Sequence, residues 1–399
     1  MSDPVTFSVV APRIMLVGGG TVAELPGLLA KLGLARPFVV TDPVMVSTGL
    51  LRRCLDPLER AGIHAAVFSD TIPEPTDAVV ELGVERLAAA AADCLVAFGG
   101  GSPMDTAKAM AILAEGRRTD PHARMRAFKV PFQADTASLP VVAIPTTAGT
   151  GSECTRFTVI TDTERDEKML IAGLGALPLA AIVDYELTFS VPRRTTADTG
   201  VDSLTHALEA YVSRRANPVS DALAVSAMTL IGRNLRRAFA EPHDREAREG
   251  MMLGATQAGL AFSNSSVALV HGMSRPIGAH FHVPHGLSNA MLLPALTRFS
   301  LAAAEPRYAE AARRIGLARD DDDAPTAARA LADGLVQLNR DLDVPTPRGF
   351  GIKEADWERS LPTMAEQALA SGSPANNPRV PDAAEIVALY REVWAGEGN

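Results

Sequence analysis

The feature that most constrains the fold is a change in sequence texture near residue 190. From about residue 5 to 190, short β-branched segments alternate with amphipathic segments. This alternation predicts a parallel β-sheet with helices on both faces. From 193 to 399 the chain is rich in Ala and Leu at helical spacing and has hardly any β-branched runs. We therefore expect an α/β domain over 1–190 and an all-helical domain over 191–399.

The pattern predicts individual elements within each half. Every expected strand is a short apolar run that ends near Gly, Asp or Pro, and every expected helix shows a 3.6-residue period. In the first half we expect strands at 13–17, 37–42, 64–68, 94–98, 140–144 and 180–183, helices at 21–33, 47–61, 76–92 and from Pro103, and a hairpin of 156–161 with 168–172. In the second half the clearest helices are 199–211, 220–239, 248–262 and 327–342.

Charge and cysteine usage exclude several classes of protein. A net charge of -9 without a Lys/Arg cluster makes nucleic acid and anionic membranes poor partners. The three cysteines form no C-x-x-C pair, which favours a reducing cytoplasm over a disulfide framework. The first residues lack the pattern of a signal peptide, and the chain has no long uncharged apolar run, so we expect neither secretion nor a membrane span.

A glycine turn marks the first candidate ligand site. Gly99-Gly100-Gly101-Ser102-Pro103 joins an expected strand to an expected helix. Glycines let backbone N–H groups approach an anion closely, and a helix N-terminus attracts phosphate. A tight turn without a ligand is the alternative. The usual dinucleotide fingerprint G-x-G-x-x-G is absent here and at the other triple glycine, 18–20.

Two further features follow neighbouring strands. Residues 145–153 form a loop rich in Thr and Gly whose hydroxyls can reach a pyrophosphate or a ribose, although a polar loop with internal turns explains them equally well. Asp42 ends the second strand, where an acid can bind a ribose 2′-hydroxyl and repel a 2′-phosphate. Taken alone, an Asp that starts a turn before Pro43 is the simpler explanation.

Acidic and imidazole side chains indicate a metal site in the helical half. Asp202 and His206 lie four residues apart on one helix face, although a simple hydrogen bond explains this pair alone. Four of the eight histidines lie between 271 and 285: His271, His280, His282 and His285. One Asp oxygen and three His nitrogens suit Fe²⁺ or Zn²⁺ and leave room for a substrate oxygen.

Together these residues resemble the iron-containing (group III) alcohol dehydrogenase family over residues 10–395. The resemblance rests on four motifs: Gly99-Gly100-Gly101-Ser102-Pro103-Met104-Asp105-Thr106-Ala107-Lys108, 145–153, 200–211 and Pro284-His285-Gly286-Leu287-Ser288-Asn289-Ala290. It implies a Rossmann-like dinucleotide-binding α/β domain, an all-helical C-terminal domain of dehydroquinate synthase-like architecture, and an active site between them.

The resemblance also assigns roles to individual residues. The implied metal ligands are Asp202, His206, His271 and His285. The implied cofactor-contacting residues are Gly99, Gly100, Gly101, Ser102, Asp105, Thr146, Thr147 and Thr150, with Val159, Lys168 and Leu187 near the nicotinamide and its ribose. Asp42 matches the acid that binds the adenosine ribose, which favours NAD over NADP.

One position departs from the family pattern. Many relatives carry His four residues after the third ligand, whereas this chain has Arg275. Proton transfer must then differ, or His280 or His282 takes the role. The guanidinium of Arg275 can pair with a carboxylate or phosphate on the substrate. Equally, it can stack on the cofactor or pair with a carboxylate of the protein.

These features predict a metal-dependent, NAD(P)-linked alcohol dehydrogenase or aldehyde reductase. The metal would act as a Lewis acid on the alcohol or carbonyl oxygen while hydride passes to or from the nicotinamide. The alternatives on the same fold are a hydroxyacid–oxoacid transhydrogenase and a dehydroquinate synthase-like lyase, and a metal-binding protein without catalysis is the third. By resemblance we also expect a homodimer or a larger homo-oligomer.

Overall fold

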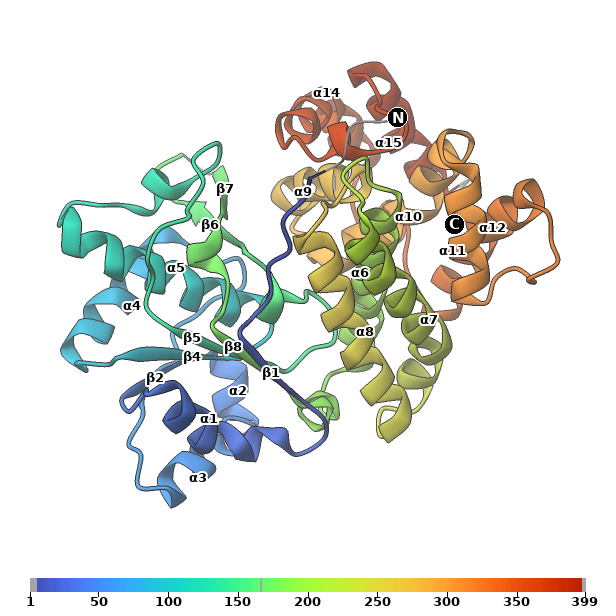
Figure 1. Ribbon diagram of the computed structural model, residues 1–399. Helices are drawn as coiled ribbons and strands as arrows, with labels where there is room; N and C mark the ends of the chain where they lie inside the picture. The colour runs from blue at the N-terminus through green and yellow to red at the C-terminus, as the bar shows by residue number, and fades with distance from the viewer. Residues whose placement is uncertain (1–5, 166, 397–399) are drawn as a thin grey trace. The chain divides into compact units, whose positions relative to one another are not determined.

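The computed structural model describes residues 6–165 and 167–396, which form two compact units (Figure 1). The first unit is Val10–Ser190 and the second is Val191–Asn399, with which residues 6–9 are grouped. The division between Ser190 and Val191 falls where the sequence changes texture. The grouping of residues 6–9 with the helical unit was not expected from the sequence.

The first unit is built on a parallel six-stranded sheet, which confirms the predicted α/β fold. The strands follow the order β1-β8-β5-β4-β2-β3. Parallel sheets are covered on both faces, so their strands are continuous apolar runs, and β2, β4, β5 and β8 are buried along their whole length. The strands are β1 (Ile14–Val17), β2 (Pro37–Val40), β3 (Ala66–Phe68), β4 (Cys94–Gly99), β5 (Val141–Pro145) and β8 (Ala180–Val183).

Helices cover this sheet on both faces. Along β2, Phe38 and Val40 join one apolar cluster while Val39 joins another, because successive strand residues point to opposite faces. The first cluster includes residues of α4 and α5, and the second includes residues of α1 and α3. The helices of this unit are α1 (Leu25–Leu32), α2 (Pro43–Ser47), α3 (Arg52–Arg60), α4 (Asp77–Ala89) and α5 (Gly101–Thr119).

The expected helix at 47–61 is wrong in its boundaries. The chain forms α2 and α3 instead, and Gly49 between them has a φ of 75°. This left-handed conformation, which glycine adopts at little cost, interrupts the helical hydrogen bonding. The expected helix at 21–33 is likewise divided into a 3₁₀ turn, η1 (Thr21–Glu24), and α1.

A β-hairpin follows the threonine-rich loop, as the sequence predicted. The antiparallel strands β6 (Phe157–Asp162) and β7 (Glu167–Ala172) form it, with Thr161 opposite Lys168. The buried ammonium of Lys108 on α5 donates to Ser152 Oγ at 2.9 Å and to the carbonyl oxygen of Phe157 at 3.0 Å. The base of the hairpin is therefore tied to α5. The short 3₁₀ turns of this unit are η2 (Met125–Phe128), η3 (Ser152–Cys154), η4 (Leu174–Ala176) and η5 (Tyr185–Thr188).

The second unit is helical throughout the residues described, which confirms the predicted all-helical fold. Its helix α6 is buried over most of its length and packs closely on α7, because a Cβ at Gly200 would lie only 2.2 Å from Leu235 Cδ1. The helices are α6 (Arg193–Val212), α7 (Pro218–Ala240), α8 (Arg245–Ser263), α9 (Leu269–Phe281), α10 (His285–Ser300), α11 (Glu305–Ile315), α12 (Ala324–Asp341), α13 (Pro347–Phe350), α14 (Glu354–Ala370) and α15 (Ala383–Ala395), with the 3₁₀ turns η6 (Leu301–Ala303) and η7 (Pro374–Asn376).

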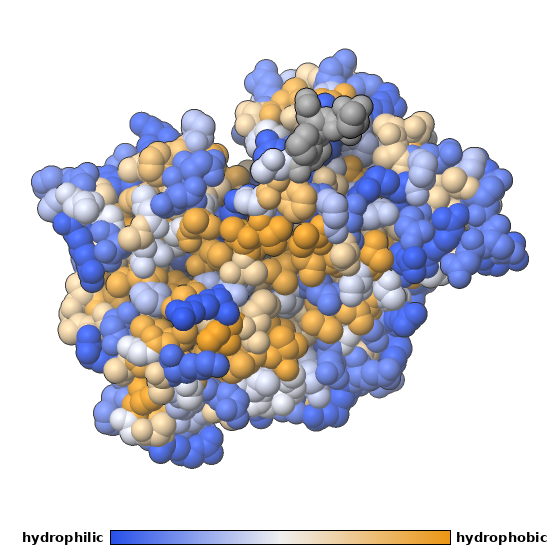
Figure 2. All heavy atoms as spheres, viewed as in Figure 1, coloured by the Kyte–Doolittle hydropathy of each residue, from blue (hydrophilic) through white to orange (hydrophobic). Residues whose placement is uncertain are grey.

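The region of α11 and α12 presents a mostly hydrophilic surface (Figure 2). The acidic turn between these helices is solvated, since the side chains of Arg319 and Asp321 are 79% and 80% exposed. Within the described part of the chain, none of the helices combines the length and the apolar character that crossing a bilayer requires.

Candidate functional site

Three loops of the first unit emerge side by side at the carboxyl edge of the sheet. Strand β4 lies between β5 and β2, so the segments that follow these strands are neighbours. Gly99 is paired in register with Pro145, and the backbone N–H of Thr146 donates to the Gly99 carbonyl oxygen at 2.9 Å. The glycine turn, the threonine loop and Asp42 therefore meet where parallel α/β sheets bind ligands.

The glycine turn and the threonine loop are in close contact. A Cβ at Gly101 would lie 3.0 Å from Thr150 Cγ2, and one at Gly100 would lie 3.6 Å from Thr147 Oγ1. Among the residues described, no side chain caps the N-terminus of α5 at Gly100. The first N–H groups of a helix have no partner within the helix, so this end of α5 is suited to bind an anion.

The two oxygens of the Asp42 carboxylate have different surroundings. Its Oδ1 accepts hydrogen bonds from the backbone N–H groups of Val44 and Met45, at 2.8 and 3.0 Å, and so caps α2. Its Oδ2 lies 3.4 Å from the position that a Cβ on Gly99 would occupy. The structural role and a ligand-binding role are therefore compatible, because the second oxygen faces the glycine turn.

Asp105 lies behind the glycine turn and contacts the protein. Its carboxylate accepts from Ser152 Oγ at 3.4 Å and from the backbone N–H of Val159 at 3.3 Å. Burial raises the pKa of Asp105 to about 6, although the nearby Lys108 opposes the shift. These contacts indicate that Asp105 shapes the segment from Ser152 to Val159.

The remaining predicted cofactor residues occupy different surroundings. Val159, on β6, is half-buried. Lys168 on β7 forms an ion pair with Glu74. Leu187 in η5 is fully buried in the apolar cluster that contains residues of α1 and α3. The assignment of these three residues to the nicotinamide and its ribose continues to rest on the resemblance.

In the second unit the four predicted metal ligands converge. Asp202 Oδ1 lies 3.5 Å from His271 Nε2, 3.7 Å from His285 Nε2 and 3.9 Å from His206 Nε2. A tetrahedral ion with bonds of about 2.1 Å would hold its ligand atoms about 3.4 Å apart. One carboxylate oxygen and three imidazole nitrogens at these separations fit Fe²⁺ or Zn²⁺.

Three helices bring these ligands together. Asp202 and His206 lie one turn apart on α6, while α9 carries His271 and α10 begins at His285. The rings of His206 and His271 stack with centroids 4.4 Å apart. A Cβ at Gly286 would lie 2.4 Å from the carbonyl oxygen of Asp198, so only glycine lets the start of α10 approach α6 this closely. This explains why glycine follows His285 in the sequence.

Charge in the group favours a bound cation. Burial opposes ionisation of Asp202, but the facing imidazoles of His206, His285 and His271 hold its pKa well below the usual range. Burial also opposes the charged form of His271, yet hydrogen bonds with Asp202 and Glu209 raise its pKa to about 9. The carboxylates thus stabilise positive charge at His271, whereas desolvation lowers the pKa of His285 to about 3 and keeps that imidazole neutral, as a metal ligand must be.

Two residues of this group were missed in the sequence. Glu209 accepts a hydrogen bond from His271 Nδ1 at 2.7 Å. Asn289 Nδ2 lies 2.6 Å from Asp202 Oδ1 and 3.2 Å from His271 Nε2, and within the described residues its buried Oδ1 has no partner. Their spacing could have identified them, because Glu209 is seven residues after Asp202 and Asn289 is four after His285, which places each on the same helix face as a predicted ligand.

The three predicted catalytic side chains are not equivalent. Arg275 lies four residues after His271 on α9, on nearly the same helix face, and donates to Ser373 Oγ at 3.3 Å. His280 lies about 13 Å further along the axis than His271 and on the opposite face by helical geometry. It contacts Gln367 Oε1 at 3.0 Å, and His282 ends the helix with a φ of 54°. Arg275 is therefore better placed than either histidine to act beside the ligand group.

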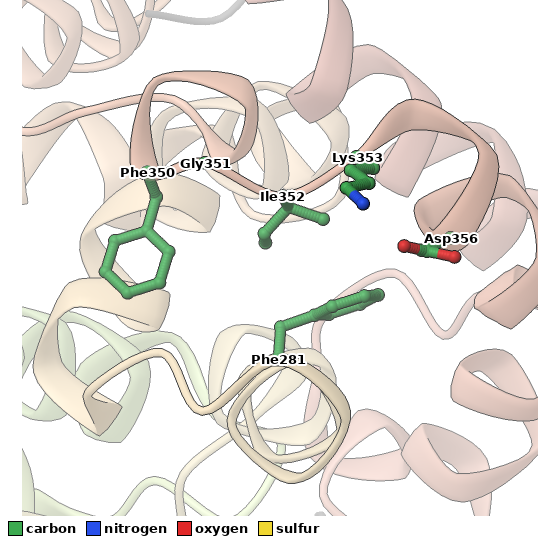
Figure 3. A pocket seen from close by; sticks show the side chains of 6 residues that line it. All are labelled: Phe281, Phe350, Gly351, Ile352, Lys353 and Asp356. Carbon is green, nitrogen blue, oxygen red and sulfur yellow. The ribbon is translucent and has the colours of Figure 1, made fainter.

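A separate hollow of about 240 Å³ lies on the surface of the second unit (Figure 3). Phe281 points into it from the end of α9, and the opposite wall comes from the chain between α13 and α14. Phe281 is ten residues after His271, which is about 15 Å along a helix. The hollow is thus distinct from the ligand group; it is lined by Phe281, Phe350, Gly351, Ile352, Lys353 and Asp356.

Comparisons with known proteins cover both units. Residues 12–185 match the family described as iron-containing alcohol dehydrogenase, and residues 196–394 match the C-terminal part of the Fe-containing alcohol dehydrogenase family. Lactaldehyde reductase of Escherichia coli (strain K12) is 35% identical over 94% of this chain and 97% of its own length. The 1,3-propanediol dehydrogenase of Citrobacter freundii is 36% identical over 97% and 99%, respectively.

Solved structures of similar oxidoreductases also match nearly the whole chain. A crystal structure of 1,3-propanediol oxidoreductase is similar with a TM-score of 0.92 and 35% identity, covering 98% of this chain and 100% of the other. Sulfoacetaldehyde reductase from Bifidobacterium kashiwanohense, in complex with NAD⁺, has a TM-score of 0.87 and 30% identity over the same shares of the two chains.

Proposed function

The chain belongs to the iron-containing alcohol dehydrogenase family, and on this premise we propose which of its residues hold metal and cofactor and which substrates they accept. As a member of the family it is an oxidoreductase that acts on CH–OH groups and is linked to NAD(P). We propose that it interconverts small alcohols and aldehydes that carry an acidic group, with NAD preferred over NADP and Fe²⁺ preferred over Zn²⁺.

The observation that carries the proposal is the convergence of Asp202, His206, His271 and His285 in one group, in which His285 is exposed and the other three are buried. These four side chains would hold the metal. When bound, the metal supplies Lewis acidity toward an alcohol or carbonyl oxygen, and the nicotinamide gives or takes the hydride. The protein orients both groups and keeps the ligands desolvated, since Asp202, His206 and His271 are buried.

The dinucleotide would bind across the three loops of the first unit. The uncapped start of α5, with Gly99 to Ser102, would take the pyrophosphate, and the hydroxyls of the threonine loop would support it. Asp42 Oδ2 would accept a hydrogen bond from the adenosine ribose and would repel a 2′-phosphate. This charge is the reason for proposing NAD as the preferred cofactor.

Arg275 supports the substrate class. Within residues 6–165 and 167–396, no carboxylate lies at ion-pair distance from its guanidinium, although burial lowers its pKa. Glu209 favours the charged guanidinium through space without forming an ion pair with it. A mostly buried cation that no carboxylate of the described chain contacts favours binding of an anionic ligand, and a guanidinium pairs with carboxylate or sulfonate through two hydrogen bonds. Sulfoacetaldehyde reductase, by its name, acts on an aldehyde with such a group.

The route of the substrate proton is a further part of the proposal. His280 and His282 would serve only through intervening water, because in the described part of the chain neither is in contact with the four proposed ligands. Replacing each by Ala and measuring the pH profile of kcat would identify a relay residue by the loss of one limb. Unchanged profiles for both variants would rule out both histidines and leave solvent as the direct proton source.

The metal assignment is tested with His271→Ala. This variant should lose bound metal and should lose more activity than the roughly 10- to 100-fold that removal of an outer hydrogen-bond partner costs. Its circular dichroism should stay unchanged. His122→Ala, at an exposed position outside the ligand group, is the matched control and should keep both metal and turnover. A metal-free His271→Ala variant with normal activity would overturn the proposal.

The substrate class is tested with two aldehydes of equal length, one neutral and one carboxylated. Arg275→Ala should raise the KM for the carboxylated aldehyde at least tenfold more than the KM for the neutral one, because one ion pair is worth about 1.4 kcal/mol or more when desolvated. Equal losses on both substrates would contradict the role of Arg275.

Location in the cytoplasm and assembly into a homo-oligomer belong to the same proposal. Size-exclusion chromatography with light scattering tests the assembly.

A further inference from the structure

We propose that Glu209 is a positioning residue for the metal centre: its carboxylate fixes the orientation of His271 and the start of the helix that carries it. The inference rests on the proposed function, in which His271 is a ligand. Glu209 belongs to α6, the helix that also carries Asp202 and His206. These three residues occupy positions i, i+4 and i+7, so one face of α6 supplies two ligands and the support of a third.

The carboxylate of Glu209 is fully engaged by α9 and the residue before it. Its Oε2 accepts from His271 Nδ1 at 2.7 Å and from the backbone N–H of Ala268 at 2.9 Å, and its Oε1 accepts from the backbone N–H of Val270 at 2.5 Å. The residue is only 4% exposed. Such a buried carboxylate, held by three donors, has little freedom to move.

The contact with His271 determines which ring nitrogen faces the metal. A carboxylate can only accept, so the hydrogen bond requires the proton of the neutral imidazole on Nδ1. The lone pair then lies on Nε2, the atom 3.5 Å from Asp202 Oδ1. Acidic partners of this kind fix the tautomer and ring orientation of metal-binding histidines and make them more basic ligands.

The same carboxylate replaces a local cap for α9. Ala268, the N-cap residue, has no side chain that can accept a hydrogen bond, and no side chain of its own segment caps the helix. The N–H groups at a helix start need acceptors, and Glu209 takes two of them from a different helix. One side chain therefore determines both where α9 begins and how its third residue, His271, is oriented.

A plain structural cap would explain the backbone contacts but would leave metal binding unchanged. Glu209→Gln separates the two roles because it keeps the size of the side chain. Its single carbonyl oxygen can replace one carboxylate oxygen, while its amide group must face a donor. The control is Asn217→Ala, which removes a buried cap from α7 in the same unit without contacting any of the four ligands.

The probe is Co²⁺, titrated into the apo forms of the full chain in competition with a chelator. Glu209→Gln should weaken Co²⁺ binding roughly 10- to 100-fold and should change the visible d–d spectrum, as outer hydrogen-bond partners typically do. Asn217→Ala should lower the thermal midpoint of the apo protein and leave both the affinity and the spectrum unchanged. A Glu209→Gln variant with lower thermal stability but unaltered affinity and spectrum would reduce Glu209 to a helix cap and overturn the inference.

A second measurement decides the question if Glu209→Gln fails to fold. Nitrogen NMR of the wild-type chain, labelled at histidine, reports which nitrogen of His271 carries the proton. The spectra are recorded above pH 9, where the imidazole is neutral, because the pKa of His271 is raised to about 9. We expect the Nδ1–H form there; an Nε2–H form in the apo protein at that pH would overturn the inference. The Co²⁺ affinity of His271→Ala distinguishes failure of this inference from failure of the proposed function. If His271→Ala binds Co²⁺ as tightly as wild type, His271 is not a ligand and both proposals fail; if it does not, only the role of Glu209 is in question.

Discussion

The chain has two triple-glycine turns, each at the end of a strand of the same sheet. They differ in whether a carboxylate of the protein accepts hydrogen bonds from their backbone N–H groups. In the turn after β1, the backbone N–H groups of Gly20 and Val22 donate to the carboxylate of Asp184, at 2.9 and 3.2 Å. In the turn after β4, the helix α5 starts at Gly101 without a side-chain cap among the described residues. The protein itself satisfies the first turn, and the second is the turn at which we propose that the pyrophosphate binds.

Position in the sheet accounts for the difference. Strand β1 is an edge strand that pairs with β8, and η5 after β8 covers its turn: a Cβ at Gly19 would lie 2.8 Å from the ring of Tyr185. Strand β4 is flanked by β5 and β2, whose following loops bring hydroxyls and Asp42 to the same edge. A glycine turn before a helix therefore predicts an anion site only where no carboxylate of the chain accepts hydrogen bonds from the backbone N–H groups of that turn.

Among substitutions that test the difference between the two turns, Asp184→Ala should cause the largest loss of folding stability. Asp184→Ala removes an acceptor from the backbone N–H groups of Gly20, Val22 and Glu186, and each buried donor left unsatisfied costs about 1–3 kcal/mol. Chemical denaturation should show a loss of several kcal/mol. NADH affinity of the folded fraction, measured by fluorescence, should be unchanged. Parallel loss of NADH affinity would mean that the first turn also binds the cofactor.

The next prediction compares alanine substitutions at two glycines, one in each turn, that have similar backbone conformations. Gly18 and Gly99 have φ values of 139° and 148°, so Gly18→Ala and Gly99→Ala should both lose about 1–3 kcal/mol of stability from backbone strain. The added methyl at Gly99 also meets Pro103 Cγ at 2.6 Å, at the proposed pyrophosphate site. NADH binding should weaken at least about tenfold in Gly99→Ala alone. Equal weakening in both variants would contradict the distinction between the turns.

A smaller effect is expected on cofactor choice. Asp42→Ser removes the negative charge near the second glycine turn while keeping an oxygen that can cap α2. The ratio of kcat/KM for NADP to that for NAD should rise roughly tenfold, the factor that 1.4 kcal/mol of relieved repulsion would give. The thermal midpoint should hardly move. An unchanged ratio would show that Asp42 acts only as a helix cap.

An effect on stability without an effect on cofactor binding is expected at Gly20, which has a φ of 78° and, among the described residues, no atom within 4 Å of a built Cβ. The difference between two variants at this position is the smallest effect that we expect. Gly20→Ala should cost about 1–2 kcal/mol, the usual penalty of a left-handed conformation. Gly20→Asn should cost less, because Asn tolerates this region better. Thermal melts of the two variants provide the measurement, with NADH affinity as the control. A larger loss for Asn than for Ala would show that space, and not backbone conformation, limits this position.

Patterns that are local in sequence predicted most of the fold. The apolar run that became β2 and the periodicity of the helical half are such patterns, and so is the Asp202–His206 spacing within the site. What could not be predicted are contacts between distant segments: Asp184 binds a turn 162 to 164 residues earlier, and Glu209 lies 62 residues before His271. The helix break at Gly49 was missed because glycine is tolerated within helices and signals a break only through its φ.

The buried ammonium of Lys108 has a consequence for mobility. It donates to Ser152 Oγ, to the carbonyl oxygens of Thr155 and Phe157, and to Thr155 Oγ1, so one cation holds a segment that otherwise forms only a single 3₁₀ turn. Because such local anchoring opposes opening, deuterium should enter the amides of residues 152–157 almost as slowly as those of the sheet. The walls around a bound dinucleotide would then be rigid before it arrives, and little ordering entropy would oppose its capture.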